Sequence, residues 1–235
     1  MNVLDILKQK MIKTPWKKFY KKNEMKIKVE DVSIYEMVRR SAVANGENVA
    51  INYFGRHITY REFLSKIDKA ASSFRSFGIR KGDVVTICMP NTPEGIISFY
   101  AINKIGAIAN MIHPLSSEVE IKNYLVSTHS VMLVMIDVCY EKIKNVIRET
   151  DVYKTIVVSA RDSMPSLLGL GYQFTQGYKI KKPKKSEEYI YWKDFLRKST
   201  SYLSDYKVDT GKDDVAVILH SGGTTGNPKG IVLSN

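Results

Sequence analysis

The chain has 235 residues, of which 44% are hydrophobic and 26% are charged. This length and composition allow one large domain or two small ones with a sizeable core, and they argue against both a disordered and a membrane-embedded protein. The formal net charge of +12 raises the question of a nucleic-acid partner.

Two lysine runs hold much of the positive charge, one within residues 17–28 and one within residues 179–185. Neither run is accompanied by zinc-finger spacing, an RNP-type aromatic motif or a helix-turn-helix signature. We therefore expect solvated lysine faces and no nucleic-acid partner. An anionic lipid surface, or the phosphates of coenzyme A, stays open as an acidic partner.

The cysteines and the apolar runs indicate the compartment. Cys88 and Cys139 are the only cysteines, and each lies beside an apolar run. This predicts buried, reduced thiols in a cytoplasmic protein, without a disulfide framework or a metal site. The longest apolar run, Val131–Ile136, has the length of a strand and is too short to span a membrane.

Residues 1–32 are predicted to form a basic N-terminal helix and linker. Apolar residues recur at helical spacing between Val3 and Ile12, with lysines between them. We expect this helix to dock on the domain, with peripheral contact to a membrane surface as the alternative. The segment lacks the apolar core and the cleavage site of a signal peptide.

The next elements carry clear boundary signals. A helix is predicted over Ser33–Ala44, with its first residue as the cap, and a hairpin over residues 49–58. Thr59 and Glu62 form a capping-box pattern that opens a second helix, and Gly78 ends it.

Strands and helices then alternate regularly. Apolar strands are predicted at residues 84–88, 107–112, 131–136 and 155–159, with a helix between each pair. This alternation predicts an α/β fold of parallel βαβ units, in which ligands bind beyond the carboxyl ends of the strands. His113 follows the second of these strands, and we expect it to have a structural role.

The alternation fails over residues 160–210, which we expect to form an irregular surface excursion rich in glycine and lysine. Tyr189–Trp192 and Phe195 mark its return to the core. Gly169 and Gly171 do not form a dinucleotide fingerprint, because Phe174 stands where a third glycine is needed.

The most informative stretch is SGGTTGNPKG over residues 221–230. Its glycines and hydroxyl side chains leave backbone N–H groups uncovered beside hydroxyls, which suits a polyphosphate. Apolar runs at 215–219 and 231–233 flank it, so we expect the loop to join two strands. It is not a Walker loop, because Gly230 stands where Ser or Thr is required after the lysine.

Residues 218–229 fit every position of the phosphate-binding signature of the adenylate-forming superfamily, which this chain therefore resembles. The superfamily includes acyl-CoA synthetases, luciferases and peptide-synthetase adenylation domains. Residues 58–63 resemble its first core motif, and residues 103–109 with 113–115 resemble its second. The likeness covers residues 33–235, which we expect to be a partial AMP-binding domain that stops after the phosphate-binding loop.

The resemblance implies a reaction and a set of roles. ATP and a carboxylic acid, here a fatty acid by expectation, form an acyl-adenylate and pyrophosphate, and the thiol of coenzyme A then takes the acyl group. Thr224 is implied as the magnesium contact, and Lys229 as the cation that balances charge on the departing pyrophosphate, so these two are the catalytic candidates. The phosphate contacts implied by the same motif are Ser221, Gly222, Gly223, Thr224, Thr225, Gly226 and Lys229.

Several alternatives stay open at this point. The family's ribose-binding and hinge segments and its small C-terminal domain lie beyond residue 235, so we expect an N-terminal portion that is inactive alone. The alternatives are a non-catalytic nucleotide-binding homologue, a peptide-synthetase-type adenylation domain, and a basic RNA-binding or membrane-binding module. His220, beside the phosphate loop, is equally balanced between a ligand contact and a structural role.

Overall fold

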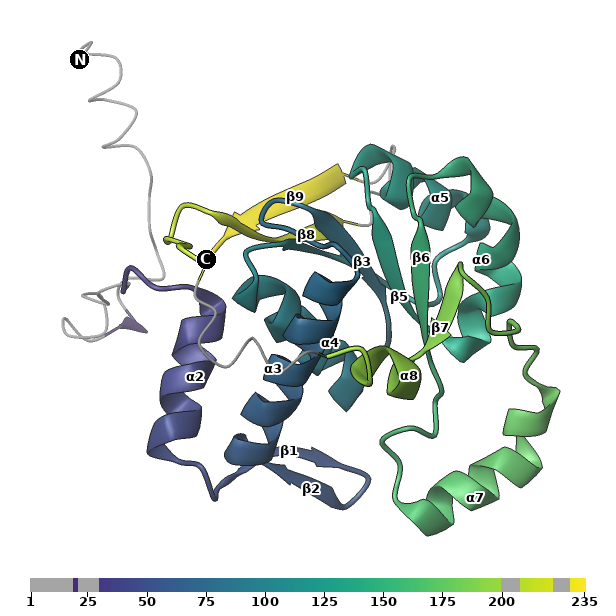
Figure 1. Cartoon of the computed structure of the whole chain (residues 1–235), viewed down its shortest axis with the longest axis horizontal. Coiled ribbons are helices and arrows are strands. Elements are labelled where there is room, and N and C mark those ends of the chain that lie inside the picture. Colours follow the sequence, from purple (N-terminus) through teal and green to yellow (C-terminus); the bar gives the residue numbers. More distant parts are fainter. Residues whose placement is uncertain (1–18, 21–29, 200–207, 222–228) are drawn as a thin grey trace. The chain divides into compact units, whose positions relative to one another are not determined.

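The computed structural model describes residues 19–20, 30–199, 208–221 and 229–235. The chain divides into two units, residues 1–31 and residues 32–235. All the helices and strands named below belong to the second unit, which is described by itself (Figure 1). The predicted N-terminal helix lies outside the described residues.

A seven-stranded sheet, counted over the described residues, forms the centre of this unit, with the strand order β7-β6-β5-β3-β4-β8-β9. All neighbouring strands are parallel except β9, which pairs antiparallel with β8 at one edge. The strands are β3 (Val84–Cys88), β4 (Ile108–Ile112), β5 (Met132–Ile136), β6 (Lys154–Val158), β7 (Tyr189–Tyr191), β8 (Val215–Ser221) and β9 (Lys229–Ser234). The predicted parallel α/β fold is therefore confirmed.

The helices pack in two groups. Helices α2, α3 and α4 contact one another and α8 contacts α3, while α5 packs with α6 (Figure 1). The helices are α2 (Ile34–Ala44), α3 (Tyr60–Ser76), α4 (Pro93–Lys104), α5 (Glu118–Ser127), α6 (Tyr140–Val146), α7 (Ser166–Thr175) and α8 (Trp192–Leu196), with short 3-10 turns η2 (Asp137–Cys139), η3 (Ile147–Glu149) and η4 (Gly177–Lys179). A separate hairpin of β1 (Val49–Tyr53) and β2 (Arg56–Thr59) precedes α3.

The strand order reverses next to β3. From β3 the chain moves to β4 on one side, and from β4 it returns across β3 to β5 on the other side. Because parallel crossovers are right-handed, this reversal places α4 and α5 on opposite faces of the sheet. The carboxyl ends of β3 and β4 thus flank a topological switch point, the position where open α/β sheets bind ligands.

The helix starts follow the sequence signals. Ser33 and Thr59 each accept a hydrogen bond from the backbone N–H three residues later, as predicted. The carboxylate of Glu62 pairs with Lys66, one turn further along α3, at 3.2 Å. The reciprocal capping box is formed instead at Ser117, whose backbone N–H donates to the carboxylate of Glu120.

The prediction for residues 160–210 was partly wrong. Residues 166–175 form α7, although glycine in a helix interior costs about 1 kcal/mol relative to alanine. Gly169 is buried, and a Cβ added at this position would be in ordinary van der Waals contact with Arg161, so packing does not require glycine here. The predicted return to the core is confirmed, since β7 pairs with β6 and both Trp192 and Phe195 are buried.

Both cysteines are buried and carry free thiols, as predicted. Cys88 ends β3 and Cys139 lies in η2 after β5, and their Sγ atoms are 4.0 Å apart. Among the described residues, no helix has the length and apolar character that crossing a membrane requires.

Candidate active site

The β8–β9 hairpin carries the glycine-rich motif at the carboxyl end of β8. The two strands pair from Val215 and Ser234 at one end to Ser221 and Lys229 at the other. The strand–loop–strand arrangement predicted for the motif is therefore confirmed. Because β8 lies parallel to β4, the motif lies at the carboxyl ends of the strands, the same end of the sheet as the switch point.

Two of the predicted site residues are described, and they face each other across the mouth of the loop. The hydroxyl of half-buried Ser221 donates to the backbone carbonyl of Lys229 at 3.5 Å. Lys229 is exposed, and no ion pair is formed by it within the described residues. Its ammonium group is thus available to an anion held by the loop. The remaining predicted contacts, Gly222, Gly223, Thr224, Thr225 and Gly226, lie outside the described residues.

His220 is held by the sheet. Its Nε2 atom lies 2.7 Å from the amide oxygen of Asn110 on β4, and its ring stacks on Tyr124 with 3.9 Å between ring centroids. The amide nitrogen of Asn110 donates elsewhere, so its oxygen must be the acceptor and Nε2 the donor. Nδ1 of the neutral ring then carries the lone pair, and this atom is buried without a hydrogen-bond partner in the described part of the chain.

Burial lowers the pKa of the His220 imidazole, which favours the neutral ring. The hydrogen bond to Asn110 uses one of the two ring nitrogens, so only Nδ1 remains for a further partner. The contacts of His220 with Asn110 and Tyr124 thus support a structural role for this histidine, and sequence reasoning did not identify them.

Asn110 is the centre of a buried polar network that connects three strands. Its amide nitrogen donates to the hydroxyls of Thr86 at 2.7 Å and Thr128 at 3.2 Å. Ser130 completes the network, 2.6 Å from Thr86 and 2.8 Å from Thr128. Every member has a partner, as buried polar groups require, and the network fixes the loop end of β8 relative to β3 and β4.

His113 has a local role at the end of β4. Its side chain is exposed, and Nδ1 accepts a hydrogen bond from the backbone N–H of Leu115 at 3.1 Å. This contact stabilises the turn before α5, which agrees with the structural role expected for this histidine.

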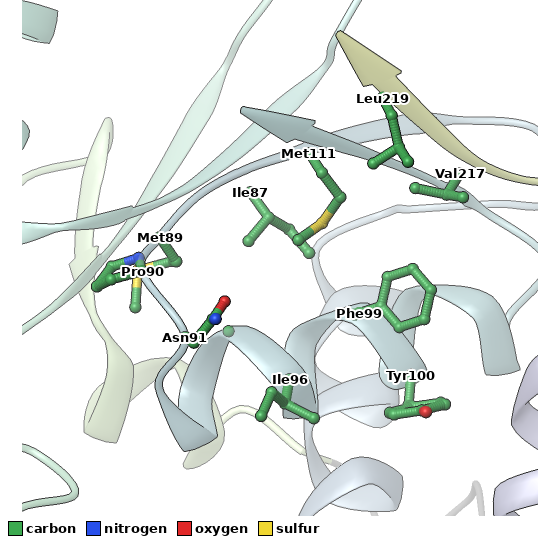
Figure 2. Close-up of a pocket in the computed structure, with 11 residues that line it drawn as sticks. Ile87, Met89, Pro90, Asn91, Ile96, Phe99, Tyr100, Met111, Val217 and Leu219 are labelled. Atoms are coloured by element: carbon green, nitrogen blue, oxygen red, sulfur yellow. The ribbon is translucent and has the colours of Figure 1, made fainter. Parts of the chain in front are cut away.

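A mostly apolar groove lies between the sheet and α4, beside the hairpin (Figure 2). Its volume is about 400 Å³, within the range of small-molecule sites. Side chains of β3, β4 and β8 form one wall, and α4 with the turn before it forms the other (Figure 2). The lining residues are Ile87, Met89, Pro90, Asn91, Gly95, Ile96, Phe99, Tyr100, Met111, Val217 and Leu219.

This groove can take a hydrocarbon or aromatic group, because Asn91 and Tyr100 are the only described lining residues whose side chains contribute nitrogen or oxygen atoms. Sequence reasoning missed it, although the signal was available. Ile87, Met111 and Leu219 lie near the carboxyl ends of neighbouring strands, where the predicted fold places ligands.

Whether this site can bind ATP and magnesium depends on the hydroxyl and charged groups that the hairpin presents. The hydroxyl of Ser221 and the ammonium group of Lys229, which forms no ion pair with another described residue, are suited to phosphate oxygens. Within the described residues, no group of three or more His, Cys, Asp or Glu side chains could hold a metal ion.

A family model described as "AMP-binding enzyme" matches residues 38–235. The chain belongs to this family. The match begins within α2 and includes the whole sheet and the hairpin, so the family assignment covers the fold as well as the loop.

Relatives of this AMP-binding chain include a CoA ligase and acetyl-coenzyme A synthetases. It is 27% identical over 205 residues to the long-chain-fatty-acid–CoA ligase of Bacillus subtilis (strain 168), covering 86% of this chain and 36% of the relative. It is 28% identical over 204 residues to acetyl-coenzyme A synthetase 2 of Saccharomyces cerevisiae, covering 84% of this chain and 29% of the relative. The chain thus spans about a third of the length of these relatives.

Solved structures agree on the fold. A long-chain-fatty-acid-CoA ligase (FadD1) from Archaeoglobus fulgidus superposes with a TM-score of 0.68 at 24% identity, covering 88% of this chain and 38% of that one. The anthranilate CoA ligase AuaEII, solved in complex with anthranoyl-AMP, superposes with a TM-score of 0.72 at 20% identity, covering 87% of this chain and 35% of that one.

Proposed function

We propose that this chain supplies the ATP-phosphate site of an AMP-forming acid–thiol ligase that uses coenzyme A as the acceptor. The observation that carries the proposal is the position of the phosphate-binding motif. It lies on the β8–β9 hairpin, beside the switch point of a sheet that belongs to the AMP-binding family. The CoA-ligase relatives support the choice of acceptor.

The proposed chemistry requires that polyphosphate charge be neutralised while a weak carboxylate attacks the α-phosphorus. We assign Lys229 to the charge on the leaving pyrophosphate, and Ser221 with the loop residues to hydrogen bonds with phosphate oxygens. Thr224 is assigned to the magnesium ion, which when bound supplies Lewis-acid neutralisation of the phosphates. The hairpin positions these groups, because its two strands are held by the sheet on one side.

The acid is proposed to be a fatty acid. The fatty-acid–CoA ligase relative and the apolar groove beside the hairpin support this choice. The acetyl-CoA synthetase relatives match with similar identity, so chain length has to be tested directly.

The test is carboxylate-dependent exchange of labelled pyrophosphate into ATP by the protein at its native length. Acids from acetate to palmitate, with benzoate and anthranilate, serve as substrates. We expect exchange with fatty acids, and a loss of about a hundredfold or more for Lys229→Ala and Thr224→Ala. Lys69→Ala, an exposed lysine on α3, is the matched control and should exchange normally.

Residues 1–235 alone are proposed to bind ATP without completing the reaction. Exchange by this segment alone would contradict that part of the proposal. If the native-length protein binds ATP but supports exchange with no acid, the non-catalytic nucleotide-binding alternative replaces the enzyme.

A further inference from the structure

The connection between β6 and β7 has an unusual charge pattern. Residues 163–178 contain no charged side chain, and residues 179–185 then contain five lysines. No aspartate or glutamate occurs from residue 163 to residue 186. These 24 consecutive residues therefore consist of an uncharged stretch followed by a stretch in which lysine is the only charged residue type.

The structure places the apolar side chains of this stretch on the surface. Helix α7 has ten residues, and Gly169 is the only buried one. Leu167 is 84% exposed and Phe174 is 78% exposed, and Leu170 and Tyr178 are also more than half exposed. Large contiguous apolar surfaces on a folded protein mark interaction sites, whereas single exposed leucines do not.

The lysines that follow differ in how they are held. Lys182 forms a 2.8 Å ion pair with the buried carboxylate of Asp137, so it fixes the segment to the end of β5. Lys181 and Lys185 are also paired within the protein, with Glu141 at 3.6 Å and Asp194 at 2.5 Å. Lys179 and Lys184 are exposed, and the ammonium group of Lys179 lies 5.5 Å from the centroid of the Tyr178 ring. Basic groups therefore border the apolar residues directly.

We propose that α7 and the lysines of residues 179–185, together called the α7 surface, bind the surface of an anionic lipid bilayer. A helix of ten residues is too short to cross a bilayer, but its exposed leucines and Phe174 can enter the interfacial region. Lysines beside such a helix reach the anionic headgroups, and an aromatic residue such as Tyr178 suits the same depth.

The charge pattern favours a bilayer over a second copy of the chain. Two α7 surfaces in contact would bring the exposed Lys179 and Lys184 of both copies together, which is unfavourable. An anionic bilayer offers an apolar interior and negative headgroups to the same surface. This site is separate from the basic N-terminal segment, for which peripheral membrane contact was also expected.

The test is co-sedimentation of the full chain with vesicles of phosphatidylcholine alone, or of phosphatidylcholine and phosphatidylglycerol at three to one. We expect binding to the anionic vesicles only, and weaker binding in 0.5 M salt. The double variant Leu170→Ser/Phe174→Ser should lose about tenfold or more in affinity. Leu115→Ser, which removes a 79% exposed leucine elsewhere, should bind normally.

A charge variant tests the proposed contact between the lysines and the anionic headgroups. Lys179→Glu/Lys184→Glu should lose about tenfold in affinity and reduce the salt dependence, whereas Lys69→Glu on α3 should not. Fluorescence gives a readout of insertion, because a Phe174→Trp side chain should shift to shorter wavelength on anionic vesicles. All substituted side chains are exposed, so unchanged thermal melts will verify folding.

Unchanged vesicle binding in the α7 variants would overturn the proposal and assign binding to the N-terminal lysines. Absence of binding to either vesicle would overturn it as well. A self-association of the chain that the Leu170→Ser/Phe174→Ser variant abolishes, without vesicle binding, would assign the surface to a second copy.

Discussion

At the scale of single residues, Asn110 determines how the β8–β9 hairpin is anchored. Its side chain is fully buried and links His220 on β8 to Thr86 on β3 and Thr128 after α5. The contact between residues 110 and 220 could not be predicted from the sequence. It depends on β8 being inserted beside β4 in a particular register, and nothing local to either residue specifies that register.

Asn110→Leu should destabilise the chain, because it leaves the hydroxyls of Thr86 and Thr128 and the Nε2 proton of His220 without this partner. We expect a loss of about 2–4 kcal/mol in the free energy of unfolding, measured in urea. Asn45→Ala, which removes an exposed hydrogen bond at the end of α2, should cost less than about 1 kcal/mol. Equal losses in the two variants would contradict the buried network.

The lowered pKa of His220 predicts a pH dependence of stability. The folded state favours the neutral ring, so the unfolded chain binds the additional proton as the pH falls below its ordinary value of 6.5. Stability from this group is therefore full above that pH and is lost as the pH falls below it. The free energy of unfolding should decline less between pH 7.5 and pH 5.5 in His220→Gln than in the native chain. An identical decline would show that protonation of His220 does not contribute to the pH dependence of the free energy of unfolding.

The two thiols predict a reactivity pattern. Cys88 and Cys139 are almost completely buried, and the hydrogen bond with Cys139 together with burial raises the pKa of Cys88 well above its usual value. Neither thiol should react with iodoacetamide in the native chain, and both should react in denaturant, as mass spectrometry can measure. Rapid native alkylation of either cysteine would contradict the buried packing.

At the scale of elements, β9 is an exposed edge. All six of its residues are exposed, and Ile231, Val232 and Leu233 present apolar side chains beside an unpaired strand edge. Exposed apolar edges are templates for pairing with other chains.

Val232→Lys should therefore reduce self-association of residues 1–235 without lowering the melting temperature. Light scattering at increasing concentration measures this effect. Val43→Lys, at a 70% exposed position on α2, is the control and should leave scattering unchanged. Unaltered scattering in Val232→Lys would mean that β9 is not the site of association.

Elements were predictable where a single strong signal dominated. The buried strand β5 follows from an uninterrupted apolar run, and the starts of α2 and α3 follow from their capping residues. Helix α7 was missed because its two glycines and the following lysines indicate a loop by composition. The strand residues of the groove lie where the predicted fold places ligands, but the groove was missed because the sequence does not show that α4 packs opposite them.

At the scale of the whole molecule, the regular βαβ alternation predicted the parallel sheet, and the motif predicted the family. The strand order required more than the sequence offered. Strand β7 lies at one edge and β8 near the other, so the chain crosses the whole sheet between residues 191 and 215. Local secondary-structure propensity determines neither the direction in which the chain crosses the sheet nor the strand beside which β8 is placed.

That crossing has a kinetic consequence. Strand β8 pairs with β4, about a hundred residues earlier in the chain, and Asn235 bonds to Asn103 on α4 and to the backbone of Ile34. Contacts between such distant residues close large loops and form slowly. During synthesis, the first strands and helices can assemble before the hairpin has been made. The hairpin that carries the proposed phosphate site is therefore expected to form after the strands that precede it, so a nucleotide bound there would not nucleate their assembly.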